Sequence, residues 1–514
     1  MLVRIESATF VGLEVIPVTI EVSVTTGVGI HLVGLPDNAV KESLLRVVTA
    51  ISACGYRVPG RRIVINLAPA DVRKEGSMFD CAIALGILLA SGQLLLQENL
   101  RCCFWGELGL DGSLRKIPGA LPLALYAKQA GFDVCFFPAQ VRDEALMVPG
   151  IRICALDHLM AVVHCLETGH YPDRVPDQAP VIPAVGGSGE DDFKWVIGQS
   201  YVKRGLEIAA AGAHNLLMVG PPGSGKSFMA RCLASILPPM TMEESLETVK
   251  IYSVAGLGDQ VLRFPGKRPF RAPHHTATSA SLTGGGLRAM PGEISLAHNG
   301  VLYLDELVQF PSTLLNELRQ PLEERKIAIS RSRYKVTYPA SFMLVASMNP
   351  CPCGYYGDGT DRCTCHEGVL HRYWSRLSGP LMDRIDLQVA VRPIDSKQLV
   401  DWSVQEESSA EIAERVSAAR AIQKARFAGD GIYTNAQMGS HHLARYCVLS
   451  AKGRDLLGRI ISRLHLSARG YSRLLKLART LADLQGCEHI LPHHLAEAAG
   501  YRCQSDHRFF SDML

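Results

Sequence analysis

The chain has 514 residues, of which 47% are hydrophobic, 20% charged and 7% aromatic; this composition supports buried cores and excludes a wholly disordered protein. At roughly 100–200 residues per domain, the length predicts two to four domains. The formal charge of +3 does not mark the chain as a nucleic-acid-binding protein, but it leaves room for a local basic patch.

The first residues predict a cytoplasmic protein. Residues 1–20 alternate like a β-strand and lack the basic stretch and apolar block of a secretion signal. The longest apolar run, residues 81–96, is shorter than the ~20 residues that span a membrane, so we expect a buried helix and no membrane partner. Fifteen cysteines, an odd and scattered set, argue against a secreted disulfide scaffold.

Four segments follow one another along the chain. Residues 1–170 mix strand and helix patterns, and residues 171–192, rich in proline and glycine, are expected to be a linker. Residues 193–393 place short β-branched strands ahead of helices and Gly-rich loops, as in a parallel α/β sheet. Residues 394–514 are mainly helical in pattern. We therefore expect two α/β domains followed by a helical domain.

The strongest motif follows a buried strand at residues 215–220. Residues 220–227 fit the pattern G-x-x-x-x-G-K-[ST] and run into a helical segment, which is the setting that a phosphate-binding loop requires and a chance Gly-rich turn lacks. Lys226 would bind the outer phosphates of ATP and Ser227 would hold Mg²⁺. The rest of the predicted phosphate loop is Gly220, Pro221, Pro222, Gly223, Ser224 and Gly225.

Two further strands end in polar residues that suit the same site. Residues 300–306 read GVLYLDE; Asp305 would hold the magnesium through Ser227 or water, and Glu306 would activate the attacking water. This acidic pair favours hydrolysis over phosphoryl transfer to a small substrate. The strand at 342–347 leads into Asn349, which could orient the water. The alternative for Asn349 is a turn-forming residue before proline.

A cysteine cluster lies just beyond that asparagine. Cys351 and Cys353 are followed, after a Gly-rich loop, by Cys363 and Cys365. Four thiolates could hold a structural Zn²⁺ tetrahedrally. The spacing is C-x-C rather than the commoner C-x₂-C, and the alternative is four reduced cysteines in a short loop.

In this order the motifs resemble those of an AAA+ ATPase. Residues 268–286 (RPFRAPHHTATSASLTGGG) and 291–307 (PGEISLAHNGVLYLDEL) are similar to the magnesium-chelatase-like branch, and residues 66–88 (NLAPADVRKEGSMFDCAIALGIL) with 106–124 (GELGLDGSLRKIPGALPLA) resemble a Lon-protease-like domain. This layout identifies the chain as a member of the ComM (YifB-like) family. The resemblance implies an α/β AAA+ P-loop core with an α-helical lid, preceded by the Lon-like domain. It also implies an ATP-driven, homo-hexameric DNA helicase for branch migration during natural transformation.

The Lon-like domain departs from an active protease. Such a protease uses a Ser–Lys dyad, but Met78 stands where the nucleophile would be, Ser77 lies one position early, and the expected lysine position falls near Leu123. A nucleophile without its base is inert. We expect this domain to be a binding or assembly module without catalytic activity.

The resemblance also implies roles for two arginines. Arg384 lies where a ring ATPase presents an arginine finger to its neighbour, and Arg473, on a basic amphipathic helix beginning near residue 471, would reach back to the γ-phosphate. The alternatives are a surface ion pair for Arg384 and a solvated helix face for Arg473.

Two basic segments are candidates for DNA contact. The first contains Lys267, Arg268 and Arg271 with interleaved aromatic residues, and the second is a predicted hairpin at 326–338 with Arg331 and Arg333 at its tip. Rings of these charges would focus a field on DNA phosphates. The alternative is two ordinary solvated loops.

Two other functions use the same motifs. The first is a magnesium-chelatase-like chaperone ATPase acting on a protein partner, and the second is a nucleotide-gated scaffold. The Lon-like domain argues against the first, since chelatase ATPase subunits lack it, and Glu306 and Arg384 argue against the second.

Overall fold

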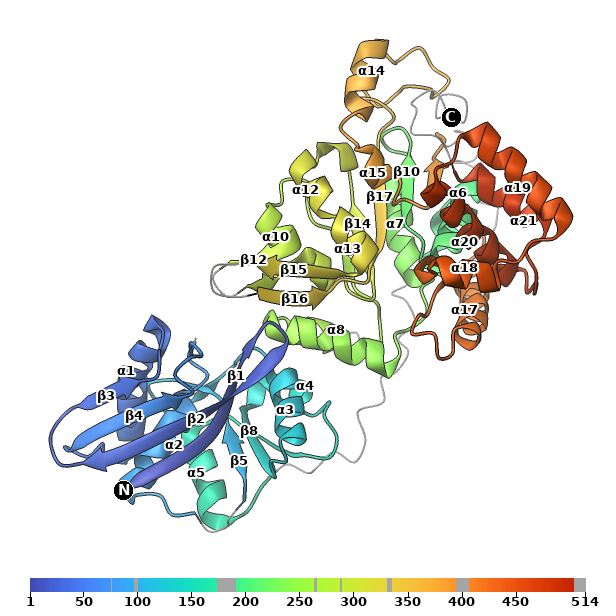
Figure 1. Cartoon of the computed structure of the whole chain (residues 1–514). Helices are drawn as coiled ribbons and strands as arrows, with labels where there is room; N and C mark the ends of the chain where they lie inside the picture. The colour runs from blue at the N-terminus through green and yellow to red at the C-terminus, as the bar shows by residue number, and fades with distance from the viewer. Residues whose placement is uncertain are drawn as a thin grey trace.

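The computed structural model describes residues 1–74, 76–96, 100–172, 191–262, 266–286, 289–330, 335–393 and 406–502. These residues form an N-terminal unit (up to 172), a central unit (191–393) and a C-terminal lid (406–502), arranged in that order from the lower left of Figure 1. Most of the predicted linker lies outside the described residues.

The N-terminal unit is built on a seven-stranded sheet with the order β3-β4-β2-β1-β5-β8-β9. The β1–β2 and β2–β4 pairs are antiparallel, whereas the other neighbours are parallel. The strands are β1 (Leu2–Val11), β2 (Glu14–Thr25), β3 (Ile30–Val33), β4 (Arg62–Ala68), β5 (Cys102–Phe104), β8 (Val134–Pro138) and β9 (Arg152–Leu156), with a separate pair, β6 (Glu107–Leu108) and β7 (Leu114–Arg115).

The helices of this unit cover the sheet. They are α1 (Asn38–Ala53), α2 (Asp80–Ala90), α3 (Ala120–Gln129), α4 (Arg142–Ala145) and α5 (Leu159–Thr168). Helix α2 is buried along its whole length, as the apolar run predicts, but it ends at Ala90 rather than near residue 96. The chain turns at Gly92, whose φ of 75° is left-handed. No helix among the described residues is long and apolar enough to cross a membrane.

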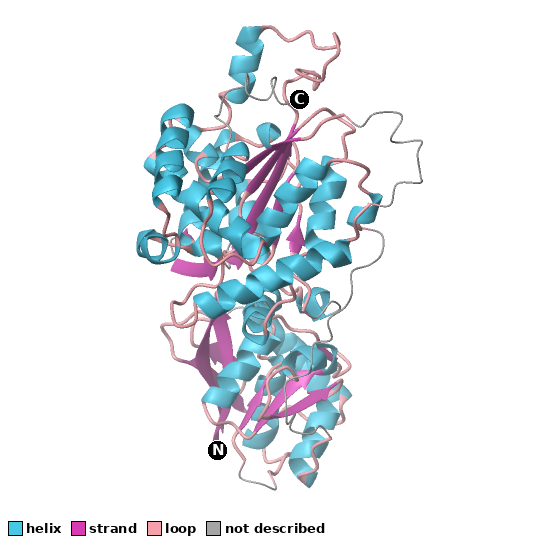
Figure 2. Cartoon of the chain, turned by 90° about the vertical axis from the view of Figure 1, so that its right-hand side faces the viewer, coloured by secondary structure: helices cyan, strands magenta, loops and turns pink. Residues whose placement is uncertain are grey.

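The central unit has a five-stranded sheet with the order β11-β14-β17-β10-β18. All neighbouring strands are parallel, so their carboxyl ends meet at one edge. Figure 2 shows this sheet between layers of helices. The strands are β10 (Leu216–Val219), β11 (Phe270–Arg271), β14 (Val301–Leu304), β17 (Met343–Met348) and β18 (Leu387–Ala390).

The helices of the central unit and two hairpins complete it. The helices are α6 (Ser200–Gly212), α7 (Lys226–Ser235), α8 (Met242–Val254), α9 (Gly258–Leu262), α10 (Ser279–Thr283), α11 (Glu293–Leu296), α12 (Ser312–Glu317), α13 (Arg319–Glu324), α14 (Glu367–Trp374) and α15 (Gly379–Met382). The hairpins are β12–β13 (Gly284–Gly285 and Met290–Pro291) and β15–β16 (Lys326–Ser330 and Lys335–Pro339).

The C-terminal lid packs on α6 and shares one hydrophobic core with the central sheet. Its helices are α17 (Ser409–Arg426), α18 (Ser440–Tyr446), α19 (Ala451–Leu464), α20 (Ala468–Leu484) and α21 (Pro492–Gly500). Helix α20 begins three residues before the predicted start near residue 471, because the Ser467 side chain accepts a hydrogen bond from the Gly470 N–H at 3.1 Å and caps the helix.

Helix α8 of the central unit completes the N-terminal core. It lies across the junction of the two units (Figure 1), and its Val249, Ile251 and Tyr252 are buried with the core residues of the N-terminal unit. The two units are therefore packed together rather than only tethered.

Candidate active site

The phosphate loop connects β10 to α7 at the carboxyl edge of the central sheet. Gly220 donates its N–H to Met348 O at 3.2 Å, and a Cβ at this position would overlap Val391 O, so only glycine fits. Gly225 precedes α7 with a left-handed φ of 82°. The loop therefore ends at a helix N-terminus, whose free N–H groups form an anion-binding site.

Lys226 is the first residue of α7 and is only 8% exposed. Its Nζ donates to Gly220 O at 2.8 Å, to Pro221 O at 2.7 Å and to Asn349 Oδ1 at 3.3 Å. Burial lowers the pKa of this amine to about 8, against the attraction of the nearby Asp305 and Glu306. An incoming phosphate would take over these hydrogen bonds and favour the charged amine.

Ser227 and Asp305 lie together at the ends of neighbouring elements. The Ser227 hydroxyl donates to Asp305 Oδ2 at 2.8 Å, and Ser347 donates to Asp305 Oδ1. Burial raises the pKa of the Asp305 carboxyl, but the hydrogen bonds from Ser347 and Ser227 outweigh it, so the pKa is lowered. An ionised carboxylate beside a hydroxyl suits Mg²⁺, which prefers oxygen ligands.

Glu306 follows in a left-handed conformation, with φ 52°. Such a backbone is rare for a residue with a Cβ and is found preferentially at functional sites. Its side chain is 53% exposed, and its Oε2 lies 3.8 Å from His275 Nδ1. The carboxylate is thus open to solvent beside Ser227 and Asp305, as a residue that activates water must be.

Sequence reasoning missed three contributors to this site. Ser347 directs Asp305, His275 faces Glu306, and Tyr373 donates its hydroxyl to Asn349 O at 3.1 Å. The available signal for Ser347 was a polar residue within a buried strand, and the signal for His275 was the histidine pair at 274–275.

The four predicted cysteines converge in the loop after Asn349. Their sulfur atoms all lie within 4.8 Å of one another, with Cys351–Cys353 at 3.2 Å, Cys353–Cys363 at 3.6 Å and Cys351–Cys363 at 3.9 Å. Four sulfurs at 2.3 Å from a tetrahedral zinc would be separated by about 3.8 Å, so the donor set fits Zn²⁺.

This cysteine loop also contacts the phosphate loop. A Cβ on Gly354 would lie 2.7 Å from Pro222 Cδ, so the two backbones approach closely. Trp374 donates its indole N–H to Pro350 O at 3.0 Å. The loop is therefore placed to support both Asn349 and the phosphate loop.

Arg384 is buried, with a side chain 5% exposed. Its guanidinium donates to Arg319 O at 3.1 Å and Pro380 O at 2.5 Å, and pairs with Glu323 at 2.5 Å. These contacts lie within its own subunit, and a role on a neighbour's nucleotide stays a prediction.

The structure corrects the expectation for Arg473. This arginine pairs with Asp386 and donates to Arg384 O at 3.0 Å. Asp386 directly precedes β18 and lies beside Asn215 at the start of β10, whereas the phosphate loop follows the end of β10. Four strand residues span about 13 Å, so Arg473 does not reach the γ-phosphate of its own subunit.

Two of the predicted DNA-contact residues form ion pairs with neighbouring helices. Arg268 donates to both Glu244 oxygens, at 3.0 and 2.8 Å, and Arg271 to both Glu293 oxygens, at 2.7 and 2.6 Å. These ion pairs hold the segment onto α8 and α11, and contact of Arg268 and Arg271 with DNA stays a prediction. Lys267 is half-buried, and Arg331 and Arg333 lie outside the described residues.

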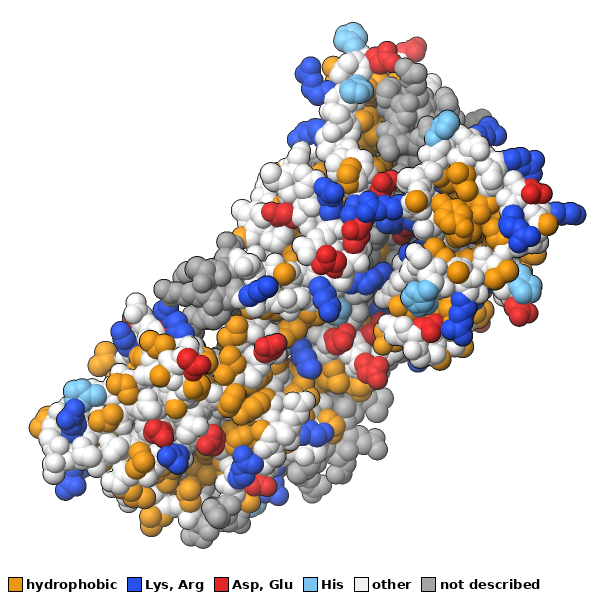
Figure 3. All heavy atoms as spheres, viewed as in Figure 1, with side chains coloured by type: hydrophobic (Ala, Val, Ile, Leu, Met, Phe, Trp, Pro, Cys, Tyr) orange, Lys and Arg blue, Asp and Glu red, His pale blue; other side chains and the backbone are white. Residues whose placement is uncertain are grey.

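Charge is otherwise mixed over the face seen in Figure 3, where Lys and Arg side chains gather between the central unit and the lid. Arg469 shares the Glu323 carboxylate with Arg384, at 3.3 Å. Together with Arg473, these arginines make the junction basic.

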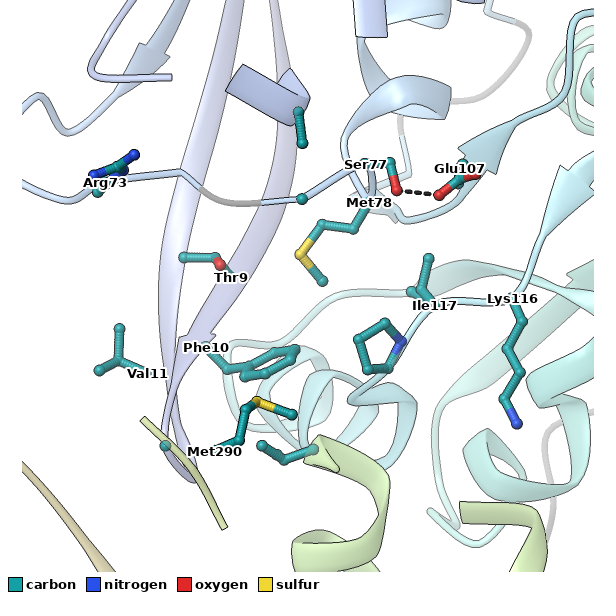
Figure 4. Close-up of a pocket in the computed structure, with 15 residues that line it drawn as sticks. Thr9, Phe10, Val11, Arg73, Ser77, Met78, Glu107, Lys116, Ile117 and Met290 are labelled. Carbon is teal, nitrogen blue, oxygen red and sulfur yellow. Dashed lines mark hydrogen bonds between the residues drawn. The ribbon is translucent and has the colours of Figure 1, made fainter. Parts of the chain in front are cut away.

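A cavity of about 320 Å³ lies between the N-terminal unit and the central unit, lined by Ser77 and Met78 of the first and by Val254 and Met290 of the second. Figure 4 shows Met78 pointing into it and Ser77 turned toward Glu107, to which it donates a hydrogen bond. Lys116 points away and pairs with Asp259 at 2.5 Å. Leu123 is buried in α3. The nearest partner of Ser77 is thus an acid, which cannot serve as the base of a Ser–Lys dyad.

Comparisons with known families cover most of the chain. Residues 192–399 match the model described as magnesium chelatase, subunit ChlI, residues 20–141 match subunit ChlI of Mg-chelatase, and residues 406–502 match the C-terminal model of that subunit.

Full-length relatives are more similar. The chain is 43% identical over 498 residues to the competence protein ComM of Haemophilus influenzae and 42% identical over 492 residues to YifB of Salmonella typhimurium, covering 96% of this chain and 95% of each relative. The magnesium-chelatase 67 kDa subunit of Chlorobaculum parvum is 26% identical over 162 residues, 31% of this chain and 23% of that protein.

Proposed function

The chain belongs to the ComM (YifB-like) family of magnesium-chelatase-like AAA+ proteins, and from this we propose that it is an ATP-hydrolysing motor acting on DNA. In this proposal it forms a cytoplasmic homo-hexamer that drives branch migration when incoming DNA is integrated. The relative named as a competence protein supports a role in natural transformation.

The observation that carries the ATPase proposal is the convergence of one polar set on the phosphate loop. Lys226 contacts Asn349, and Ser227 contacts Asp305. Lys226 would bind the outer phosphates, Ser227 and Asp305 would hold Mg²⁺, and Asn349 would orient the water. Glu306 would take the proton from that water as it attacks the γ-phosphorus, while ADP leaves with the electron pair of the broken bond.

The position of the arginines supports a shared site. Arg384 and Arg473 lie at the opposite end of the sheet from Lys226, and the Arg473 guanidinium donates to the backbone carbonyl of Arg384. In a ring, this basic end would face the nucleotide of the adjacent subunit, where arginine stabilises the charge that develops on the transferred phosphoryl group. Both residues would then act on the neighbour's ATP.

For DNA, we propose contact through the tip of the β15–β16 hairpin, Arg331 and Arg333, together with Lys267. The double variant Arg331→Ala/Arg333→Ala should weaken DNA binding and flatten its salt dependence by about 0.9 per lost phosphate contact on duplex DNA, or about 0.7 on single strands. Basal ATP hydrolysis should persist, because the nucleotide contacts described above do not involve the hairpin. An unchanged salt slope would place the DNA site elsewhere.

One experiment separates this proposal from a chelatase-like chaperone ATPase. ATP hydrolysis is measured with and without single-stranded and forked DNA, and the particles are imaged by negative stain. A motor on DNA should form rings and hydrolyse ATP faster when DNA is added. Hydrolysis that is indifferent to both DNA forms would favour a protein partner instead.

We also propose a structural Zn²⁺ held by Cys351, Cys353, Cys363 and Cys365. Four thiolates leave no open position, so the ion would brace the loop that supports Asn349 and take no part in hydrolysis. The Lon-protease-like N-terminal unit is proposed to be catalytically inactive, because Met78 replaces the nucleophile and Ser77 faces Glu107.

A further inference from the structure

The turn between β1 and β2 of the N-terminal unit packs directly on the β15–β16 hairpin of the central unit. Gly12 in this turn is buried with a left-handed φ of 64°, and a Cβ on it would overlap the Val336 side chain of β16. Val11 and Leu13, on either side, pack against the apolar cluster that contains Ile327, Ile329 and Val336. The contact is therefore a close fit of backbone against side chain.

The same turn reaches the second hairpin. Val11 and Gly12 line the cavity together with Met290 of β13, which Figure 4 shows beside Phe10. The two hairpins are also joined to each other, because the Tyr338 hydroxyl donates to Ala289 O at 2.9 Å. A displacement of β16 would therefore also shift the β12–β13 hairpin.

A second set of contacts anchors the N-terminal unit on helices of the central unit. Gly119 donates its N–H to Ser253 O of α8 at 3.0 Å. The buried Glu144 accepts hydrogen bonds from Leu121 N, at 2.9 Å, and from the Ser253 hydroxyl. Lys116 pairs with Asp259 of α9. The N-terminal unit is therefore anchored on α8 and α9 while its β1–β2 turn contacts the hairpin.

We infer that the N-terminal unit supports the two hairpins, and that Val11, Gly12 and Leu13 are positioning residues that set how the β15–β16 hairpin is presented to DNA. A two-stranded hairpin is marginally stable alone and needs a surface to pack on. The inference rests on the proposed DNA-binding role of the β15–β16 tip, and it gives the inactive domain a function in coupling DNA contact to ATP hydrolysis.

The test compares two glycines of the full-length protein. Gly12→Ala and Gly92→Ala both place a side chain at a left-handed residue of the N-terminal unit, but nothing lies within 4 Å of a Cβ at Gly92. Both variants carry the same backbone strain, and only Gly12→Ala pushes on Val336. The stimulation of ATP hydrolysis by DNA should fall about 2- to 30-fold in Gly12→Ala, the range for mutations along a packed connection, and stay at the wild-type level in Gly92→Ala.

A compensating variant tests the contact itself. Val336→Ala removes the methyl group that the new Cβ would meet, so Gly12→Ala/Val336→Ala should recover stimulation that Gly12→Ala loses, as a double-mutant cycle measures. Equal behaviour of Gly12→Ala and Gly92→Ala would overturn the inference. If Gly12→Ala does not fold, Leu13→Ala replaces it in the same assays with the same expected loss.

Amide hydrogen exchange separates this inference from the proposed function. Exchange in residues 326–330 and 335–339 should be faster in Gly12→Ala than in Gly92→Ala, with or without DNA. If DNA fails to stimulate the wild type, the DNA proposal fails. Faster exchange in the hairpin of Gly12→Ala would then still support the positioning of the hairpins by the N-terminal unit, and unchanged exchange would refute it.

Discussion

The two ends of the central sheet carry the two sets of residues that we propose act on ATP. At the carboxyl ends of β10, β14 and β17 lie Lys226, Asp305 and Asn349; Lys226 donates to Asn349, and Asp305 accepts from Ser227, the residue that follows Lys226. At the amino ends of β10 and β18 lie Arg384 and Arg473. Strands of about four residues keep the two sets some 13 Å apart, so one subunit does not bring them together.

The two ends also use their carboxylates differently. Asp305 is ionised and satisfied by hydroxyl groups, which a magnesium ion can replace. Asp386 is buried, which raises its pKa, but the charge of Arg473 and the nearby His214 imidazole, whose Nδ1 lies 3.5 Å from Asp386 Oδ2, hold that pKa well below its usual range. Asp305 has hydroxyl partners that an incoming cation can displace, whereas Asp386 is already paired with the guanidinium of Arg473.

The largest expected effect tests this division. Arg384→Ala should slow ATP hydrolysis by about 10³–10⁵-fold, the contribution of an arginine finger, while the exposed Arg459→Ala on α19 should not. Mixing Arg384→Ala with Lys226→Ala subunits should restore activity, because some interfaces then hold one intact half from each. No recovery at any ratio, with mixed rings confirmed by native mass spectrometry, would contradict a shared site.

At the carboxyl end, Glu306→Gln should lower kcat by about 10²–10⁴-fold, the usual contribution of a general base. Binding of a fluorescent ATP analogue should be unchanged, because the amide is isosteric and Glu306 does not contact the phosphate loop in the described hydrogen bonds. The exposed Glu243→Gln serves as control. A Glu306→Gln variant that hydrolyses ATP at close to the wild-type rate would remove Glu306 from the mechanism.

A smaller effect follows from the buried lysine. The pKa of Lys226 is lowered to about 8, and only the charged amine attracts phosphate, so nucleotide affinity should fall as pH rises through this value. The Kd should increase about tenfold per pH unit above it, as expected for one linked proton. Titration calorimetry between pH 7 and pH 10 measures this slope. Lys226→Ala should bind weakly with a flat profile, and a flat wild-type profile would exclude the linkage.

The smallest effect concerns the cysteine loop, whose Gly354 packs against Pro222 of the phosphate loop. Purified protein should carry about one zinc per chain, and stripping it should lower ATP hydrolysis about threefold through Asn349, within the range for indirect coupling. Nucleotide affinity should persist. Cys353→Ser should mimic the loss, whereas Cys487→Ser, outside the cluster, should not. If elemental analysis finds no zinc in protein purified without a chelator, the metal proposal is wrong.

Most of the residues at the carboxyl edge of the central sheet could be predicted, because the sequence motifs that mark them are local. The strand–loop–helix pattern around Lys226 and the GVLYLDE strand each set the position of a side chain relative to its own strand end. Parallel pairing then brings those ends together. Ser347 was harder to predict, because a serine within a buried strand signals a polar partner without showing that the neighbouring strand end places Asp305 beside it.

The sequence by itself indicated the phosphate-loop pattern, the acidic strand end, the cysteine spacing and the strands and helices that carry them, because periodicity, capping and glycine conformation act over a few residues. Only the tertiary structure decided that Arg268 and Arg271 pair with Glu244 and Glu293, and that Arg473 lies at the far end of the sheet. It also placed the β1–β2 turn on a hairpin more than 300 residues away. A charged or apolar side chain takes the partner that folding brings nearest, and that partner is set by contacts distant in the chain.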